Sequence, residues 1–260
     1  MKTKEILKYL EESVAPVKLS DEFCKKFDMY DNSGIIINSG NEVTGALFAL
    51  DLTKSAVERA VQSGYNLIVT HHPAIYGGIS KLDLTDNPLS IALAECLKHG
   101  ISVISMHLNF DAAPKGIDYY LMRGLGGESA VCAANLENGA YGRIYDVAGT
   151  SLKDYIKAVG ERLGTDRLRV YGAPDKQVSR VASFCGAGCD DHNIAFAVGN
   201  GADVFVSSDM KHHEILALTG RGIAVIEMTH YASENYGFNQ IYNKIKDGLK
   251  VPSDYYTDGS

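Results

Sequence analysis

The sequence predicts an α/β protein made of two related α/β domains with mostly parallel sheets. Short apolar runs of strand length alternate with amphipathic stretches of helix length through the 260 residues. Such alternation is typical of parallel strands covered by helices. The rhythm occurs twice, and the stretch GGESAVCAANLENG, rich in Gly and Asn, separates the two occurrences. We therefore expect an N-terminal domain over residues 1–130 and a C-terminal domain over residues 131–260.

The first half opens with an amphipathic helix in MKTKEILKYLEES, which carries apolar residues at helical spacing. Strands are then expected over 34–38, 44–50 and 66–70, and a helix over about 53–64 begins at Thr53, a suitable N-cap. Pro88 fits the first turn of the next helix, which Gly100 ends. A strand over 101–106 and a helix from about Gly116 complete this half.

The second half shows a similar alternation of elements but no visible sequence repeat of the first. Strands are expected at YGRIYDVAG, LRVYG, VSRVASFC, DVFVSS and GIAVIEM. Helices are expected over about 151–163 and 191–200, at MKHHEILALTG, and in a long last segment. The tail VPSDYYTDGS is expected to be a free end or an oligomer contact.

Composition excludes several classes of protein. Apolar residues make up 45% and charged residues 22%, which is an ordinary globular mixture. The net charge of -7 and the pI of 5.6 argue against non-specific binding to nucleic acid or to an anionic membrane, although they leave room for a local basic patch. No apolar run approaches the ~20 residues of a membrane span. The five cysteines are scattered and the N-terminus lacks a signal-peptide core, so we expect reduced thiols in a cytoplasmic protein.

Three of the predicted strands end in histidine. The first runs into the pair His71-His72. The other two run into HLNFDAAP and THYASE, where a carboxylate follows the histidine after four residues, in the pairs His107–Asp111 and His230–Glu234. Because the carboxyl ends of parallel strands form the ligand crevice of such sheets, we expect these side chains to converge between the two halves.

Imidazole and carboxylate ligands together suit zinc, iron, manganese or nickel. Five or six of them exceed the three or four ligands of one zinc ion, and suit two ions ~3.5–4 Å apart. A turn helped by Pro73 could aim both adjacent rings into one crevice. A histidine at a single strand end is more often structural, so the prediction depends on the three-part pattern. His107 could be a direct ligand or could orient Asp111 or another imidazole; we favour the orienting role.

The same segments resemble the Nif-three-like family, whose members are often called GTP cyclohydrolase I type 2 homologues. The resemblance lies in MYDNSG, THHPAIYGG, HLNFDAAPKGID, SSDMKHHEILAL and THYASE, taken together in this order. It implies a Nif-three-like fold, a dinuclear metal centre and a toroidal homohexamer. By this resemblance the metal ligands would be His71, His72, Asp111, His230 and Glu234, with Glu234 as the bridge.

The resemblance favours a hydrolase that acts on a nucleotide or related small molecule through a metal-activated water. Asp209 and His213 would relay protons or hold substrate. A phosphoesterase or amidohydrolase could use the same water. A different class is a non-catalytic protein that stores or delivers metal or acts as a scaffold.

The turn GAGC precedes a predicted helix, so its amides could hold a phosphate, although a packing turn is the simpler interpretation. Cys185 and Cys189 are interpreted as inert thiols.

Overall fold

The computed structural model describes residues 1–257, which form two compact units. Unit 1 contains residues 1–110 and the chain from Phe238 onward, and unit 2 contains residues 111–237. This division differs from the two continuous halves expected from the sequence. The chain enters unit 2 at Asp111 and returns to unit 1 within one continuous helix, α10 (His230–Ile245), so no break in the sequence marks the return.

Unit 1 is built on a five-stranded sheet of order β1-β4-β3-β2-β11. All neighbours in it are parallel except β1 and β4, which confirms the predicted parallel sheet. Its elements are α1 (Thr3–Ser13), α2 (Lys18–Phe27), β1 (Gly34–Ile37), β2 (Ala46–Ala49), α3 (Lys54–Gln62), β3 (Leu67–Thr70), α4 (Pro88–Lys98), β4 (Ser102–Ser105) and β11 (Ser253–Tyr256).

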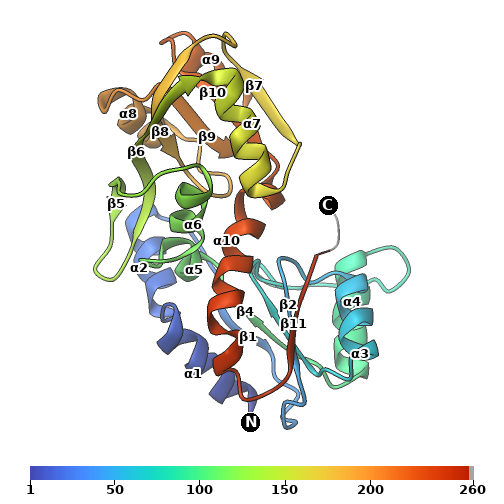
Figure 1. Cartoon of the computed structure of the whole chain (residues 1–260). Helices are drawn as coiled ribbons and strands as arrows, with labels where there is room; N and C mark the ends of the chain where they lie inside the picture. Colours follow the sequence, from blue (N-terminus) through green and yellow to red (C-terminus); the bar gives the residue numbers. More distant parts are fainter. Residues whose placement is uncertain (258–260) are drawn as a thin grey trace. The chain divides into compact units, whose positions relative to one another are not determined.

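Local capping explains where α3 and α4 begin. The Thr53 side chain accepts a hydrogen bond from the amide of Ala56, and the Asn87 side chain accepts one from the amide of Ser90. Pro88 occupies the first turn of α4, as predicted, where its missing N–H costs nothing. Figure 1 shows α3 and α4 side by side on one face of the sheet.

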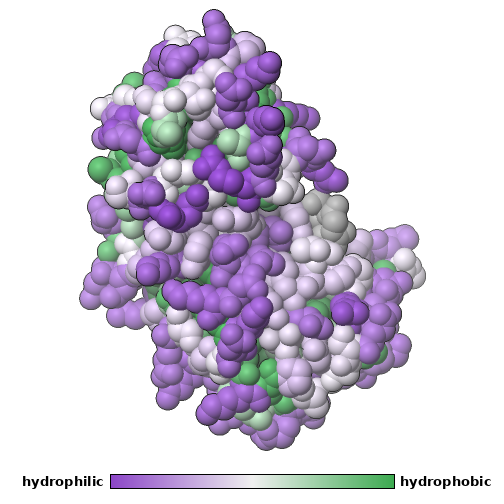
Figure 2. Space-filling model, viewed as in Figure 1, coloured by the Kyte–Doolittle hydropathy of each residue, from purple (hydrophilic) through white to green (hydrophobic). Residues whose placement is uncertain are grey.

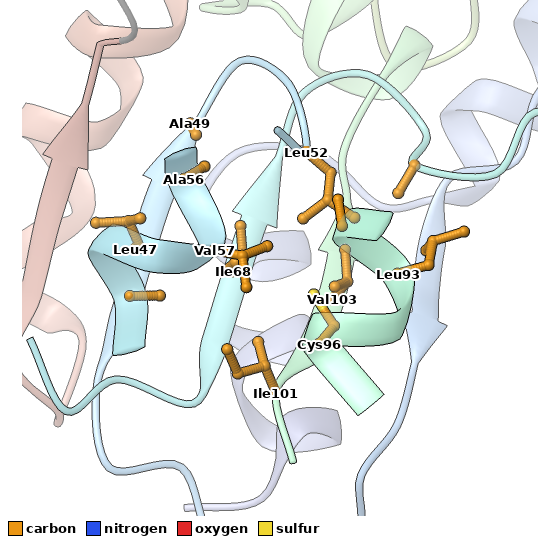
Figure 3. Packing of buried hydrophobic residues seen from close by; sticks show 13 residues of the cluster. Leu47, Ala49, Leu52, Ala56, Val57, Ile68, Leu93, Cys96, Ile101 and Val103 are labelled. Carbon is orange, nitrogen blue, oxygen red and sulfur yellow. The ribbon is translucent and has the colours of Figure 1, made fainter. Parts of the chain in front are cut away.

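The core of unit 1 lies between these helices and the strands. Alternate residues of β2 and β3, such as Leu47, Ala49 and Ile68, meet Val57 of α3 in one cluster of buried side chains (Figure 3). On the opposite face, Phe48 packs against aromatic side chains of α10, with 6.2 Å between its ring centroid and that of Phe238 and 5.0 Å to that of Tyr242. The sheet is therefore covered on both sides, as its continuous apolar strands require.

Unit 2 contains a six-stranded sheet of order β5-β6-β8-β9-β10-β7. Its pairs β8–β9 and β9–β10 are parallel, whereas β5–β6, β6–β8 and β10–β7 are antiparallel. This sheet is therefore mixed, unlike the mostly parallel sheet predicted for it. Its elements are α6 (Ile117–Gly124), β5 (Val131–Asn135), β6 (Ala140–Ser151), α7 (Leu152–Leu163), β7 (Leu168–Tyr171), β8 (Gln177–Ser183), α8 (Asp191–Gly199), β9 (Val204–Ser208), α9 (His212–Thr219) and β10 (Ala224–Met228).

Some elements were not predicted from the sequence. The supposed separator contains β5, and the tail expected to be a free end or an oligomer contact contains β11, which pairs with β2. The short helix α5 (Leu108–Ala112) and the 3-10 turn η1 (Lys246–Gly248) were also missed, as was α2. Residues 258–260 of the tail lie outside the described part.

Among residues 1–257 the structure holds no helix that is both long and apolar enough to cross a bilayer. Hydrophilic side chains dominate the face shown in Figure 2, and the hydrophobic groups on it form small separate areas.

Candidate metal centre

The histidines of unit 1 lie at the carboxyl edge of its parallel sheet. Strands β3 and β4 are paired so that Thr70 lies opposite Ser105, which places His71, His72 and His107 at the same edge. The backbone amides of His71 and His72 both donate to the carbonyl of Leu50, at 3.1 and 3.0 Å. The alternation of the strand therefore stops here, and both adjacent rings turn to the same side, with 4.8 Å between their centroids.

The rings of these three histidines form one group. The centroid of His107 lies 5.1 Å from that of His71 and 5.7 Å from that of His72. Each ring offers a nitrogen, and these nitrogens lie within 4.8 Å of one another. The group has the composition of a borderline-metal site, since imidazole suits zinc, iron and nickel.

Each Nδ1 atom of the group is held by an acceptor. His71 Nδ1 donates to the carbonyl of Met106 at 2.9 Å, a partner that can only accept, so its Nε2 carries the lone pair. His72 Nδ1 lies 2.7 Å from a carboxylate oxygen of Asp51, and His107 Nδ1 lies 2.7 Å from one of Asp31. Partners of this kind fix the tautomer and aim a histidine at a metal.

The carboxylate behind His107 is itself strongly held. Burial alone would raise the pKa of Asp31, but the hydrogen bond and charge of His107, together with the hydroxyls of Ser33 and Ser20, lower it to about 2. Asp31 is therefore ionised at neutral pH and keeps the proton of His107 on Nδ1. Its position behind the ring resembles that of Asp51 beside His72, so His107 is oriented in the same way as His72.

Unit 2 carries a matching arrangement at its own carboxyl edge. Strands β9 and β10 are parallel neighbours, and they lead into Asp209 and His230. His230 Nδ1 lies 2.5 Å from Asp209 Oδ2, and Nε2 lies 3.1 Å from Glu234 Oε1, one helical turn along α10. A neutral imidazole has one N–H, so carboxyl groups at both nitrogens call for a second proton or a cation between the ring and one of them. The donor set therefore fits a metal ion.

Asp111 lies in a buried polar cluster of unit 2. The thiol of Cys185 donates to Asp111 Oδ1 at 3.3 Å. Burial raises the pKa of this thiol well above its usual value, and the charges of Asp111, Asp118 and Glu234 add to the effect. Cys185 is therefore a protonated donor that orients Asp111, and it has none of the thiolate character of a reactive cysteine.

The Gly-rich turn after β8 serves packing. The amide of Gly186 donates to the Ser233 hydroxyl at 3.1 Å, and that of Gly188 to the Ser207 hydroxyl, also at 3.1 Å. Both glycine amides are therefore bonded within the protein, which favours the packing turn. Gly186 has φ 61°, and a Cβ built on it would lie 2.6 Å from Glu234 Oε1. The glycine therefore leaves room for the Glu234 carboxylate.

The two residues expected to relay protons have different surroundings. Asp209 is occupied with His230, so it positions a proposed ligand. His213 is exposed on α9, and within residues 1–257 no hydrogen bond or ion pair joins it to a proposed ligand. The sequence reasoning assigned no role to Asp31 and Asp51. Asp51 offered a signal, since it follows a buried strand just as the histidines do.

Comparisons with known proteins agree with this architecture. Residues 1–256 match the family model described as Duf34/NIF3 (NGG1p interacting factor 3). A Clostridium acetobutylicum protein named GTP cyclohydrolase 1 type 2 homolog is 27% identical over 240 residues, which cover 90% of this chain and 85% of that protein. The NGG1-interacting factor 3 of Saccharomyces cerevisiae is 29% identical, with 81% of each chain covered.

Solved structures show the same fold. The crystal structure of a Staphylococcus aureus hypothetical protein matches with a TM-score of 0.83 at 23% identity, covering 100% of this chain and 98% of that one. The Bacillus cereus protein related to NIF3 matches with a TM-score of 0.81 at 19% identity, covering 99% and 97%.

Proposed function

Because this chain belongs to the Duf34/NIF3 family, we propose that it is a hydrolase that binds two divalent metal ions and acts on a nucleotide or related small molecule. The observation that carries the proposal is shared by four histidines. His71, His72, His107 and His230 each have Nδ1 against a carbonyl or carboxylate oxygen, which is the kind of partner that orients a metal-binding imidazole.

The proposed ligands are His71, His72, Asp111, His230 and Glu234, to which the geometry of unit 1 adds His107. Bound zinc, iron, manganese or nickel ions would supply an activated water and polarise the bond under attack. The chain's own contribution is to hold the ligands: Asp31, Asp51 and Asp209 fix three imidazoles, and the Cys185 thiol fixes Asp111.

The test begins with elemental analysis of the purified protein. The same sample, stripped of metal and then reloaded, is assayed on a panel of nucleotides, phosphoesters and cyclic amides. We expect turnover that rises with metal occupancy. A full metal complement without turnover on any substrate would contradict the hydrolase and favour the alternative of a metal store, carrier or scaffold. Turnover of phosphoesters or amides alone would identify those reactions instead.

His107 should act as a direct ligand. Titration of metal into the metal-free His107→Ala variant should show that one ion of the pair is lost, while the other binds as in the unaltered protein. If both ions still bind and only the affinity falls, by the ~10–100-fold typical of an outer partner, then His107 orients other groups and the direct role is wrong.

The Gly186→Ala variant should lose metal because its methyl group would occupy the place of Glu234 Oε1. Gly201→Ala is a matched control, since Gly201 has a similar φ of 71° but open space where the Cβ would be. Both variants bear the same backbone cost, of order 1–3 kcal/mol. Only Gly186→Ala should lower the bound metal measured by elemental analysis, and equal metal contents in the two variants would contradict the role of this glycine.

The assembly state belongs to the same proposal. We expect a cytoplasmic toroidal homohexamer, on the family relationship alone. Light scattering of the metal-loaded protein tests the oligomer, and a monomer mass would contradict it.

A further inference from the structure

Unit 2 contains a pocket of about 500 Å³ beside a proposed metal ligand. Its lining includes His230 and Asp209 at the ends of two parallel strands, and residues before and within β7. This volume is in the range of small-molecule sites. A molecule bound here has one part next to His230. The other residues of the lining determine which chemical groups the rest of that molecule carries.

Two arginines line the pocket, Arg167 and Arg169. Arg167 is the residue just before β7, and Arg169 is the second residue of that strand. Strand β7 runs antiparallel to β10, with Arg169 opposite Glu227 and Leu168 opposite Met228. Arg167 therefore lies one residue beyond the last pair, toward the end of β10 from which His230 follows.

Both guanidinium groups keep donors for a ligand. Arg169 Nη1 lies 3.7 Å from Glu227 Oε2, and its side chain is 78% exposed, so this pair is weak. Among residues 1–257 no carboxylate forms an ion pair with Arg167. Of the pocket's acids, Asp209 holds His230, and Glu227 accepts a hydrogen bond from Tyr171 at 3.4 Å. Asp166 is exposed and opposes an anion through its charge alone.

We infer that Arg167 and Arg169 form a subsite for a phosphate group of the substrate. Guanidinium groups donate paired hydrogen bonds that match the oxygens of phosphate, and two of them balance a dianion. The inference rests on the proposed function, because it places the phosphate in the same pocket as His230. The substrate class is then a phosphate-bearing small molecule whose reacting group reaches the metal ligands while its phosphate is held at β7.

The test is a calorimetric titration of orthophosphate into metal-free protein at constant ionic strength. The Arg167→Ala/Arg169→Ala double variant should bind phosphate at least ~10-fold more weakly, the loss expected for charge-assisted hydrogen bonds. Arg221→Ala is the control, since Arg221 is an exposed arginine of unit 2 outside the pocket, and it should leave the affinity unchanged. Asp166→Asn should strengthen binding, because it removes the opposing charge.

Unchanged phosphate affinity in the double variant would overturn the subsite, as would acetate binding as tightly as phosphate. The same holds if phosphate does not bind to the unaltered protein. The titration is independent of the metal analysis. If the protein binds no metal but the double variant still loses phosphate affinity, the proposed function fails and the subsite is retained. If the double variant keeps both its metal and its phosphate affinity, only the subsite fails.

Discussion

The Glu234→Ala variant should bind neither metal ion and should show the hydrolytic rate of the metal-free protein. A carboxylate offers two oxygens and can bind two ions at once, so its removal affects both. Glu234 is 2% exposed and one of its oxygens lies 3.1 Å from His230 Nε2, which is where a shared ligand is needed. Elemental analysis of the purified variant gives the stoichiometry, and the substrate panel gives the rate.

Two further variants separate the bridging role from a general disturbance. Glu161→Ala removes an exposed carboxylate from α7 and should keep both ions. Glu234→Gln keeps the size of the side chain but loses its charge, and it should also lose metal. If Glu234→Ala retains a full pair of ions, Glu234 is no bridge.

The Asp118→Ala variant should be less stable by about 3–5 kcal/mol, the usual cost of breaking a buried ion pair. Asp118 is fully buried and pairs with Arg143, which is 4% exposed. Its carboxylate also accepts hydrogen bonds from the amides of Gly142 at 3.1 Å and Cys185 at 3.2 Å. Burial raises the pKa of Asp118 to about 6, against the opposing effect of Arg143, so the carboxylate is ionised at neutral pH. Alanine would leave a buried cation without its partner.

Denaturant unfolding measures this loss. Because the two units can unfold in separate steps, hydrogen exchange at the amides of β6 and β8 is needed to assign the loss to unit 2. The Asp118→Leu/Arg143→Met double variant is the matched control. Replacing both charges with apolar side chains should cost less than replacing Asp118 alone. A loss below about 1 kcal/mol in Asp118→Ala would show that the pair contributes little.

Features with local causes could be predicted from the sequence. The starts of α3 and α4 follow from Thr53 and from Asn87-Pro88, whose effects depend on residues a few positions away. The strands that end in histidine could be predicted for the same reason, because each histidine closely follows its apolar strand in the sequence. By contrast, β11 is a short, half-buried strand that depends on a partner about two hundred residues earlier, and no local pattern reveals that pairing.

The carboxylate partners of the histidines could not be predicted from the sequence either, because they are distant in it. Asp31 and His107 are 76 residues apart, and Asp209 and His230 are 21 apart, so only the sheet brings each pair together. The buried Cys185 thiol could not be assigned to Asp111 from its spacing to Cys189. The likeness of His107 to His71 and His72 was also hidden from the sequence, because it lies in the acceptor behind the ring.

The return of the chain to unit 1 after Gly237 bears on how the protein is made. A ribosome adds residues from the N-terminus, and a domain generally folds as a unit. All of unit 2 is synthesised before the second part of α10 and β11, which cover and extend the sheet of unit 1. Unit 2 can thus fold while the sheet of unit 1, already packed against α3 and α4, still lacks α10 on its other face. A stalled or truncated product would be exposed to aggregation and to proteases through unit 1.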